Sequence, residues 1–187
     1  MEKEQGNRRI LVIDDNVAIH DDFRKILERS LDTSLLQEVR AELFDDVEEQ
    51  TIVEKFEVET ADQGQMGHRM VQDAMKAERP YAVAFVDMRM PPGWDGVETV
   101  EHLWEEDPDL QIVICTAFSD HAWEDVIQRL NNNGQLLILR KPFDNIEVWQ
   151  LANSLTKRWV ESRQAKSQLE LLAKWAEERA EETIKAH

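Results

Sequence analysis

The chain has 187 residues, 42% of them hydrophobic, which is enough for one domain with an appendage or for two small domains around a real core. Its net charge of −17 argues against a nucleic-acid-binding surface, because such a surface needs a basic face. Cys115 is the single cysteine, so no internal disulfide forms. The N-terminus lacks an apolar signal core, and no apolar run approaches the roughly 18 residues of a membrane span. We therefore expect a cytoplasmic chain that neither inserts into a membrane nor binds nucleic acid.

Five short apolar runs predict β-strands, at residues 9–13, 55–60, 81–86, 111–115 and 135–139. Four of these runs are almost continuously apolar, as is typical of strands buried on both faces of a parallel sheet. The run at 55–60 alternates apolar and acidic residues, which suits a strand nearer an edge.

The segments between the strands carry apolar residues at helical spacing. The four stripes run from Ile19 to Leu27, through Met66, Met70 and Ala74, from Val97 to Trp104, and from Trp123 to Leu130. We interpret the methionines as core residues. Alternating strands and helices predict a doubly wound, flavodoxin-like α/β fold with five parallel strands in the order 2-1-3-4-5.

Two stretches exceed this minimal unit. Residues 31–53 form an acidic insertion after the first helix, and its apolar spacing favours an extra helix or an extension of the first. Residues 161–187 continue the last helix without glycine or proline beyond a core domain at 8–160. They contain a short, alanine-rich, coiled-coil-like seam, formed by Ala165, Leu169, Leu172, Ala176 and Ala180. A helix from Phe143 to the end would extend roughly 65 Å, so its far half must protrude or pair.

Polar residues follow four of the strands. Asp14 and Asp15 follow the first strand, Asp87 the third, Thr116 the fourth and Lys141 the fifth. In an open parallel sheet, ligands bind beyond the carboxyl ends of the strands, so these groups should converge on one pocket. Each residue alone has an ordinary structural explanation, such as a helix cap or a surface lysine. Their combination, in order and on the right strand ends, is what favours a functional site.

Three converging carboxylates repel one another unless a cation intervenes, and Mg²⁺ prefers oxygen ligands of this kind. A carboxylate beside Mg²⁺ can attack a phosphoryl donor and form an aspartyl phosphate. The ammonium of Lys141 and the hydroxyl of Thr116 could then bind the oxygens of the transferred group. The sequence therefore predicts phosphoryl capture on Asp87.

With these motifs, the chain resembles a bacterial two-component response-regulator receiver domain. The matching residues are Ile13-Asp14-Asp15, Asp87 with Met90-Pro91 and Asp95-Gly96, Thr116-Ala117, and Lys141-Pro142-Phe143. The resemblance implies that Asp15 binds Mg²⁺ directly, Asp14 through water, and that Asp87 and the backbone carbonyl of Arg89 complete the ligands. It also implies a cis Lys141-Pro142 bond, a phosphodonor that is a sensor histidine kinase or phosphotransfer protein, and no enzymatic activity beyond self-catalysed transfer to Asp87.

Three features depart from the family pattern. The loop after Asp87 is one residue longer than usual, and we expect Trp94 to be exposed beside the site. Ile138 stands where the family commonly has a tyrosine or phenylalanine that acts as a rotamer switch. Arg89 and Phe118 occupy the positions that flank the attacking water, and neither can orient it, so we predict slow self-dephosphorylation.

Other readings of the chain remain. A phosphorylation-independent pseudo-receiver, acting as a dimerisation or docking module, is favoured slightly by Ile138. A dehalogenase-type phosphatase needs an acid two residues after its nucleophile, where this chain has Arg89. The extended helix could form a homodimer or relay a signal to an effector. The helix reaches the end of the sequence without a stop signal. The sequence is therefore equally compatible with a piece cut from a longer protein and with a stand-alone adaptor.

Overall fold

A computed structural model describes residues 6–28, 55–117, 126, 128–130 and 134–185. It contains a five-stranded sheet in the order β2-β1-β3-β4-β5, in which every neighbouring pair is parallel. The flavodoxin-like arrangement predicted from the sequence is therefore confirmed. In chain order the elements are β1 (Arg9–Ile13), α1 (Val17–Leu27), β2 (Glu57–Ala61), α3 (Gly64–Lys76), β3 (Val83–Asp87), α4 (Gly96–Glu106), β4 (Gln111–Ala117), β5 (Leu136–Lys141) and α6 (Asn145–Lys185).

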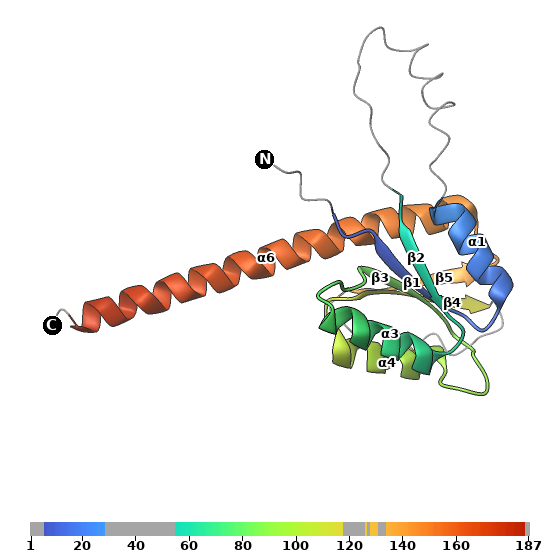
Figure 1. Ribbon diagram of the computed structural model, residues 1–187, viewed down its shortest axis with the longest axis horizontal. Coiled ribbons are helices and arrows are strands. Elements are labelled where there is room, and N and C mark those ends of the chain that lie inside the picture. The colour runs from blue at the N-terminus through green and yellow to red at the C-terminus, as the bar shows by residue number, and fades with distance from the viewer. Residues whose placement is uncertain (1–5, 29–54, 118–125, 127, 131–133, 186–187) are drawn as a thin grey trace, which may run out of the picture.

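Helices cover both faces of the sheet (Figure 1). Side chains alternate along each strand, so successive residues enter different layers of the core. In β1, Ile10 and Val12 pack with α1 and α6, whereas Leu11 and Ile13 pack with α3 and α4. This alternation explains why the central strands read as continuous apolar runs.

Two glycines let α3 approach its neighbours closely. A Cβ added to Gly67 would lie 2.2 Å from Ile13 Cδ1, and one added to Gly64 would lie 2.1 Å from Thr99 Oγ1. The face with Gly64 and Gly67 therefore points inward, with Val71 and Ala74. Because this face of α3 points inward, Met66 lies on another face and is 39% exposed. The expectation that Met66 is a core residue is therefore wrong.

The fifth strand also differs from its prediction. We expected residues 135–139 to be buried on both faces, yet Leu137 and Ile138 are each 37% exposed. The physical reason is the position of β5, since within the described residues it pairs with β4 alone and forms an edge of the sheet.

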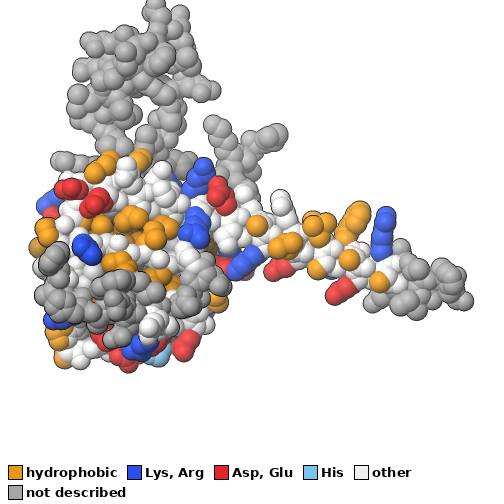
Figure 2. Space-filling view, turned by 180° about the vertical axis from the view of Figure 1, so that it is seen from behind, with side chains coloured by type: hydrophobic (Ala, Val, Ile, Leu, Met, Phe, Trp, Pro, Cys, Tyr) orange, Lys and Arg blue, Asp and Glu red, His pale blue; other side chains and the backbone are white. Residues whose placement is uncertain are grey.

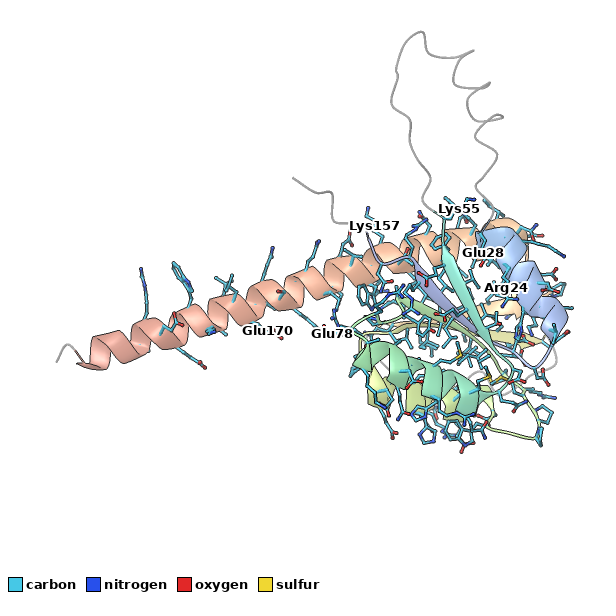
Figure 3. All side chains as sticks on the ribbon, viewed as in Figure 1. Arg24, Glu28, Lys55, Glu78, Lys157 and Glu170 are labelled. Atoms are coloured by element: carbon cyan, nitrogen blue, oxygen red, sulfur yellow. The ribbon has the colours of Figure 1, made fainter. Side chains whose placement is uncertain are left out.

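Helix α6 has 41 residues, which corresponds to about 60 Å at 1.5 Å per residue. Its first half packs on the sheet through Val148, Ala152, Leu155 and Trp159, and its second half extends away from the body (Figure 1). Lys157 lies on the part of α6 beside the sheet, and Glu170 lies on the protruding part (Figure 3). The prediction that the far half leaves the domain is confirmed.

Two predicted segments lie largely or wholly outside the described residues. These are the acidic insertion at 31–53 and the helix around 123–130. Of the latter, Val126 and Leu130 are buried, and the Leu130 N–H donates to the Val126 carbonyl. Among the helices that are described, none is long and apolar enough to cross a membrane.

Candidate functional site

The three aspartates predicted to converge lie together at the carboxyl edge of the sheet. Asp14 and Asp15 follow β1, and Asp87 is the last residue of the adjacent strand β3. One carboxylate oxygen from each lies within 4.8 Å of the others. Asp14 is 2% exposed and Asp87 is 9% exposed, whereas Asp15 opens to solvent. The cluster is therefore buried on the side of Asp14 and Asp87 and accessible to solvent on the side of Asp15.

Lys141, the last residue of β5, reaches across to this cluster. Its Nζ donates to Asp14 Oδ2 and to Asp87 Oδ1, at 2.7 Å in each case. Burial disfavours the charged ammonium, but the bonds to Asp14 and Asp87 outweigh it and raise the pKa of Lys141. Burial also raises the pKa of Asp87, against the opposing effects of Lys141 and of the Arg89 N–H. One ammonium thus holds two nearly buried carboxylates, and sequence reasoning did not foresee that it bridges both.

Asp14 is held in place by its own turn. Its Oδ1 accepts from the Asn16 N–H at 2.9 Å, while Asn16 caps α1 by accepting from the Ala18 N–H at 3.0 Å. The buried His20 places Nε2 2.7 Å from the Asp14 carbonyl oxygen, so this nitrogen carries the proton. Sequence reasoning missed His20. Its position between Ile19 and Phe23, near the apolar face of α1, was the available signal.

The loop after Asp87 is pinned at both ends. Asp87 Oδ2 accepts from the Arg89 N–H at 3.1 Å, and the Gly96 N–H donates to the Met88 carbonyl at 2.9 Å. A Cβ added to Gly96 would lie 2.6 Å from the Asp87 carbonyl oxygen, so this close approach requires glycine. Asp95 caps α4 by accepting from the Glu98 N–H at 2.8 Å. The loop thus fixes Asp87 against the start of α4.

Trp94 is not fully exposed, contrary to the expectation from sequence. Its half-buried ring stacks on His102 of α4, with centroids 4.1 Å apart, and meets His68 of α3 edge-on at 5.8 Å. His68 in turn contacts Glu106, with 3.2 Å between Nε2 and Oε1. The Trp94 ring therefore rests on the α3–α4 pair, while Pro91, Pro92, Gly93 and Asp95 around it are exposed.

Thr116 and Ile138 lie on the two strands beyond Asp87. Asp87 pairs with Cys115, so Thr116 lies one residue further toward the carboxyl edge. Thr116 is 7% exposed, and its Oγ1 donates to the Ala117 carbonyl at 3.2 Å. The Lys141-Pro142 peptide is cis, as the resemblance implied, and the Pro91-Pro92 peptide is cis as well. Asp14, Asp15, Asp87, Thr116 and Lys141 thus lie at the carboxyl ends of β1, β3, β4 and β5.

The donor set fits a hard divalent cation. All three side chains of the cluster offer carboxylate oxygens, which Mg²⁺ prefers, and the exposed Asp15 leaves one side open to water. Lys141 forms ion pairs with Asp14 and Asp87, so it brings one positive charge to a cluster of three carboxyl groups. Asp14, Asp15 and Asp87 could therefore hold the ion.

This fold and this edge of acidic residues define a signalling module. The sequence matches the model of the response regulator receiver domain over residues 32–153. The chain belongs to this family, whose members act as receiver domains in two-component signalling.

Among relatives, the chain is 34% identical over 76 residues to sporulation initiation phosphotransferase F of Bacillus subtilis (strain 168). The match spans 41% of this chain and 57% of that protein's length.

Solved structures show the same fold. The adenylate cyclase from Rhodopirellula baltica matches with a TM-score of 0.63 at 20% identity, over 88% of this chain and 98% of that chain. A CheY-like receiver domain protein from Methanospirillum hungatei JF-1 matches with a TM-score of 0.59 at 17% identity, over 83% and 98% of the two chains.

Proposed function

We propose that this receiver domain accepts a phosphoryl group on Asp87, in a Mg²⁺-dependent reaction, from a histidine kinase or a phosphotransfer protein. The observation that carries the proposal is the Lys141 ammonium placed 2.7 Å from both Asp14 and Asp87, beside the open carboxylate of Asp15. A buried ion pair alone is weak evidence of function. Here the pair lies within a three-carboxylate cluster at the ligand-binding edge of a parallel sheet.

In the proposed reaction, an oxygen of Asp87 attacks the phosphorus atom, and the bond from phosphorus to the donor breaks. Bound Mg²⁺ supplies charge neutralisation for the phosphoryl oxygens. The Arg89 N–H holds Asp87 Oδ2, and Lys141 holds Oδ1, so the carboxylate is oriented before the donor arrives. Lys141 and Thr116 would bind oxygens of the transferred group, and the carbonyl of Arg89 would join Asp14, Asp15 and Asp87 as a ligand.

Apolar side chains beside the pocket support docking of a protein phosphodonor. Val17 at the start of α1 is 65% exposed, and Ile146 at the start of α6 is 56% exposed. Both helices begin at the carboxyl edge, next to Asp15 and Lys141. The donor would cover these side chains and bring its phosphohistidine to the open side of the cluster.

The structural effect of the added phosphoryl charge would be transmitted through α6. This helix begins four residues after Lys141 and reaches far beyond the body. In this proposal, residues 8–160 form the receiver and residues 161–187 form an output helix, which joins a second copy or passes to an effector. The edge position of the aliphatic Ile138 agrees with a route that does not use an aromatic switch. It also keeps a phosphorylation-independent docking module as the second candidate.

The decisive experiment is phosphorylation by a small phosphodonor with Mg²⁺, read as the intact mass of the protein. We expect one added phosphoryl group on the wild type, none on Asp87→Ala, and normal labelling of Asp22→Ala, which alters an exposed aspartate of α1. Label that survives in Asp87→Ala would refute the assignment. A wild type that takes no label from either a small donor or a kinase would favour the docking module.

The lifetime of the phosphorylated protein tests the predicted slow hydrolysis. Arg89 and Phe118 offer neither a carboxylate nor an amide to orient water, so we expect decay over minutes or longer in Mg²⁺. Decay within seconds would contradict this prediction.

A further inference from the structure

Asp15 is the exposed member of the acidic cluster, and its side chain has little support. Lys141 bonds both Asp14 and Asp87, whereas within the described residues no hydrogen bond or ion pair contacts the Asp15 carboxylate. The place of this carboxylate therefore depends on the backbone that carries it. A metal ligand without side-chain support needs a fixed backbone to hold its oxygens in the right geometry.

Three hydrogen bonds hold the preceding residue, Asp14. Its N–H donates to the carbonyl of Ala61 at 3.1 Å, and its Oδ1 accepts from the Asn16 N–H at 2.9 Å. The third bond joins its carbonyl oxygen to His20 Nε2 at 2.7 Å. Among the contacts of the described residues, this third bond alone acts on the peptide group between Asp14 and Asp15.

The ring of His20 comes to this peptide from the buried face of α1. His20 is 6% exposed and shares that face with Phe23 and Leu27. A residue that only filled space there would need no N–H group. Asp14 is 2% exposed, so its carbonyl needs a donor from the protein, and the imidazole supplies one. His20 thus links the core side of α1 to the turn that carries Asp15.

We propose that His20 is a positioning residue for the divalent cation. Its N–H fixes the Asp14–Asp15 peptide, and this peptide directs the Asp15 carboxylate toward the cluster. The inference rests on the proposed function, since it concerns the same cation site. Without the bond the peptide can rotate, and the Asp15 oxygens then leave their place. Mg²⁺ demands near-ideal octahedral geometry, so its affinity is sensitive to such a displacement.

The affinity of the full chain for Mg²⁺, measured by titration calorimetry, tests the proposal. In His20→Gln the amide nitrogen lies where Nε2 lies, so the donor is kept. In His20→Asn the same amide is too short to reach, and His20→Met fills the space without a donor. Loss of a group that orients a metal ligand typically weakens metal affinity about 10-fold to 100-fold. We expect His20→Gln to bind Mg²⁺ about as tightly as the wild type, and the other two at least about tenfold more weakly.

Leu27→Ala is the matched control. Leu27 is 1% exposed at the far end of α1, so this change destabilises the same helix without touching the Asp14–Asp15 turn, and Mg²⁺ affinity should be unchanged. All these variants keep the protruding part of α6, along which Figure 2 shows hydrophobic side chains. At saturating Mg²⁺, His20→Met should label Asp87 at nearly the rate of the wild type, because the defect lies in cation affinity. If His20→Met does not fold, the comparison of His20→Gln with His20→Asn decides the question.

A second measurement needs no metal. Nitrogen-15 NMR of the metal-free protein should show a proton on His20 Nε2 that exchanges slowly with solvent, assigned by its loss in His20→Gln. Absence of a proton on Nε2 would overturn the proposal, as would equal Mg²⁺ affinity of His20→Gln and His20→Asn, or an equal loss of affinity in Leu27→Ala. If the wild type still takes its label on Asp87, these results refute the role of His20 alone. A wild type that binds no Mg²⁺ would refute both proposals, and one that binds Mg²⁺ but takes no label would refute only phosphoryl capture.

Discussion

Replacing Lys141 with methionine removes a cation that is bonded to two nearly buried carboxylates. The side chains of Asp14 and Asp87 are 3% and 12% exposed, and each contacts Nζ at 2.7 Å. At an effective dielectric constant of about 20, each contact corresponds to about 6 kcal/mol of Coulomb attraction. Desolvation of the charges offsets most of this attraction, and removing one partner of such a pair typically costs 3–5 kcal/mol. We expect Lys141→Met to lower the free energy of unfolding by about 3 kcal/mol at neutral pH without divalent cations.

Two conditions should reverse this loss. Mg²⁺ would replace the missing positive charge, so it should stabilise Lys141→Met more than it stabilises the wild type. Acid should also help. Burial raises the pKa of Asp87 in the folded state, and loss of Lys141 raises it further. A raised carboxyl pKa favours folding at low pH and lowers stability as the pH rises through that pKa, so the deficit should shrink toward acid pH.

Urea unfolding with and without Mg²⁺, at neutral and acid pH, measures these effects. Lys157→Met is the matched control, because the Lys157 side chain is 78% exposed and lies 3.9 Å from Glu161, a contact typical of weak surface pairs. We expect the control to change stability by less than about 0.5 kcal/mol. If Lys141→Met were as stable as the control, or if Mg²⁺ favoured it no more than the wild type, the electrostatic account of the pocket would be refuted.

Substitutions at three further residues test other parts of the structure. Burial raises the pKa of Asp107, so Asp107→Asn should be more stable than the wild type at neutral pH, and the gain should vanish below the ordinary aspartate pKa of 3.8; equal stability at neutral pH would contradict this. Gly96→Ala should lower the free energy of unfolding by about 2 kcal/mol and slow the labelling of Asp87, since its Cβ would meet backbone atoms at 2.6 and 2.9 Å. A denaturant midpoint equal to that of the wild type would contradict this. Trp94→Ala should cost about 1 kcal/mol through loss of the stack on His102, and Trp94→Phe less. Equal unfolding midpoints for the two Trp94 variants would show that an aromatic ring at this position adds no stability.

Sequence patterns located the site because strand ends are local features. Apolar runs set the strands, and the parallel order then brought Asp14, Asp87 and Lys141 to one edge. The exact ends of the strands were harder to predict from the sequence. Asp87 and Lys141 belong to β3 and β5, because pairing with the adjacent strand continues through them. His20 was missed because its position near the apolar face of α1 indicates burial but does not indicate that its ring contacts the Asp14 carbonyl.

Packing decided the features that local patterns misplaced. Met66 fits an apolar stripe, but close approach at Gly67 turns a different face of α3 inward. Trp94 belongs to an irregular loop, and only the meeting of α3 and α4 supplies His68 and His102 for its ring to contact. Such contacts depend on the distance between helices, which a period of three or four residues does not encode.

The sequence by itself determined the class of fold, the strand order and the residues of the acidic pocket, because these follow from hydrophobic period and from the geometry common to parallel sheets. Tertiary structure alone decided that Lys141 bridges Asp14 and Asp87, and that α6 loses its buried contacts with the body after Trp159. Both depend on where the body ends and on which atoms meet across it. Those are long-range distances, and a linear pattern does not contain them.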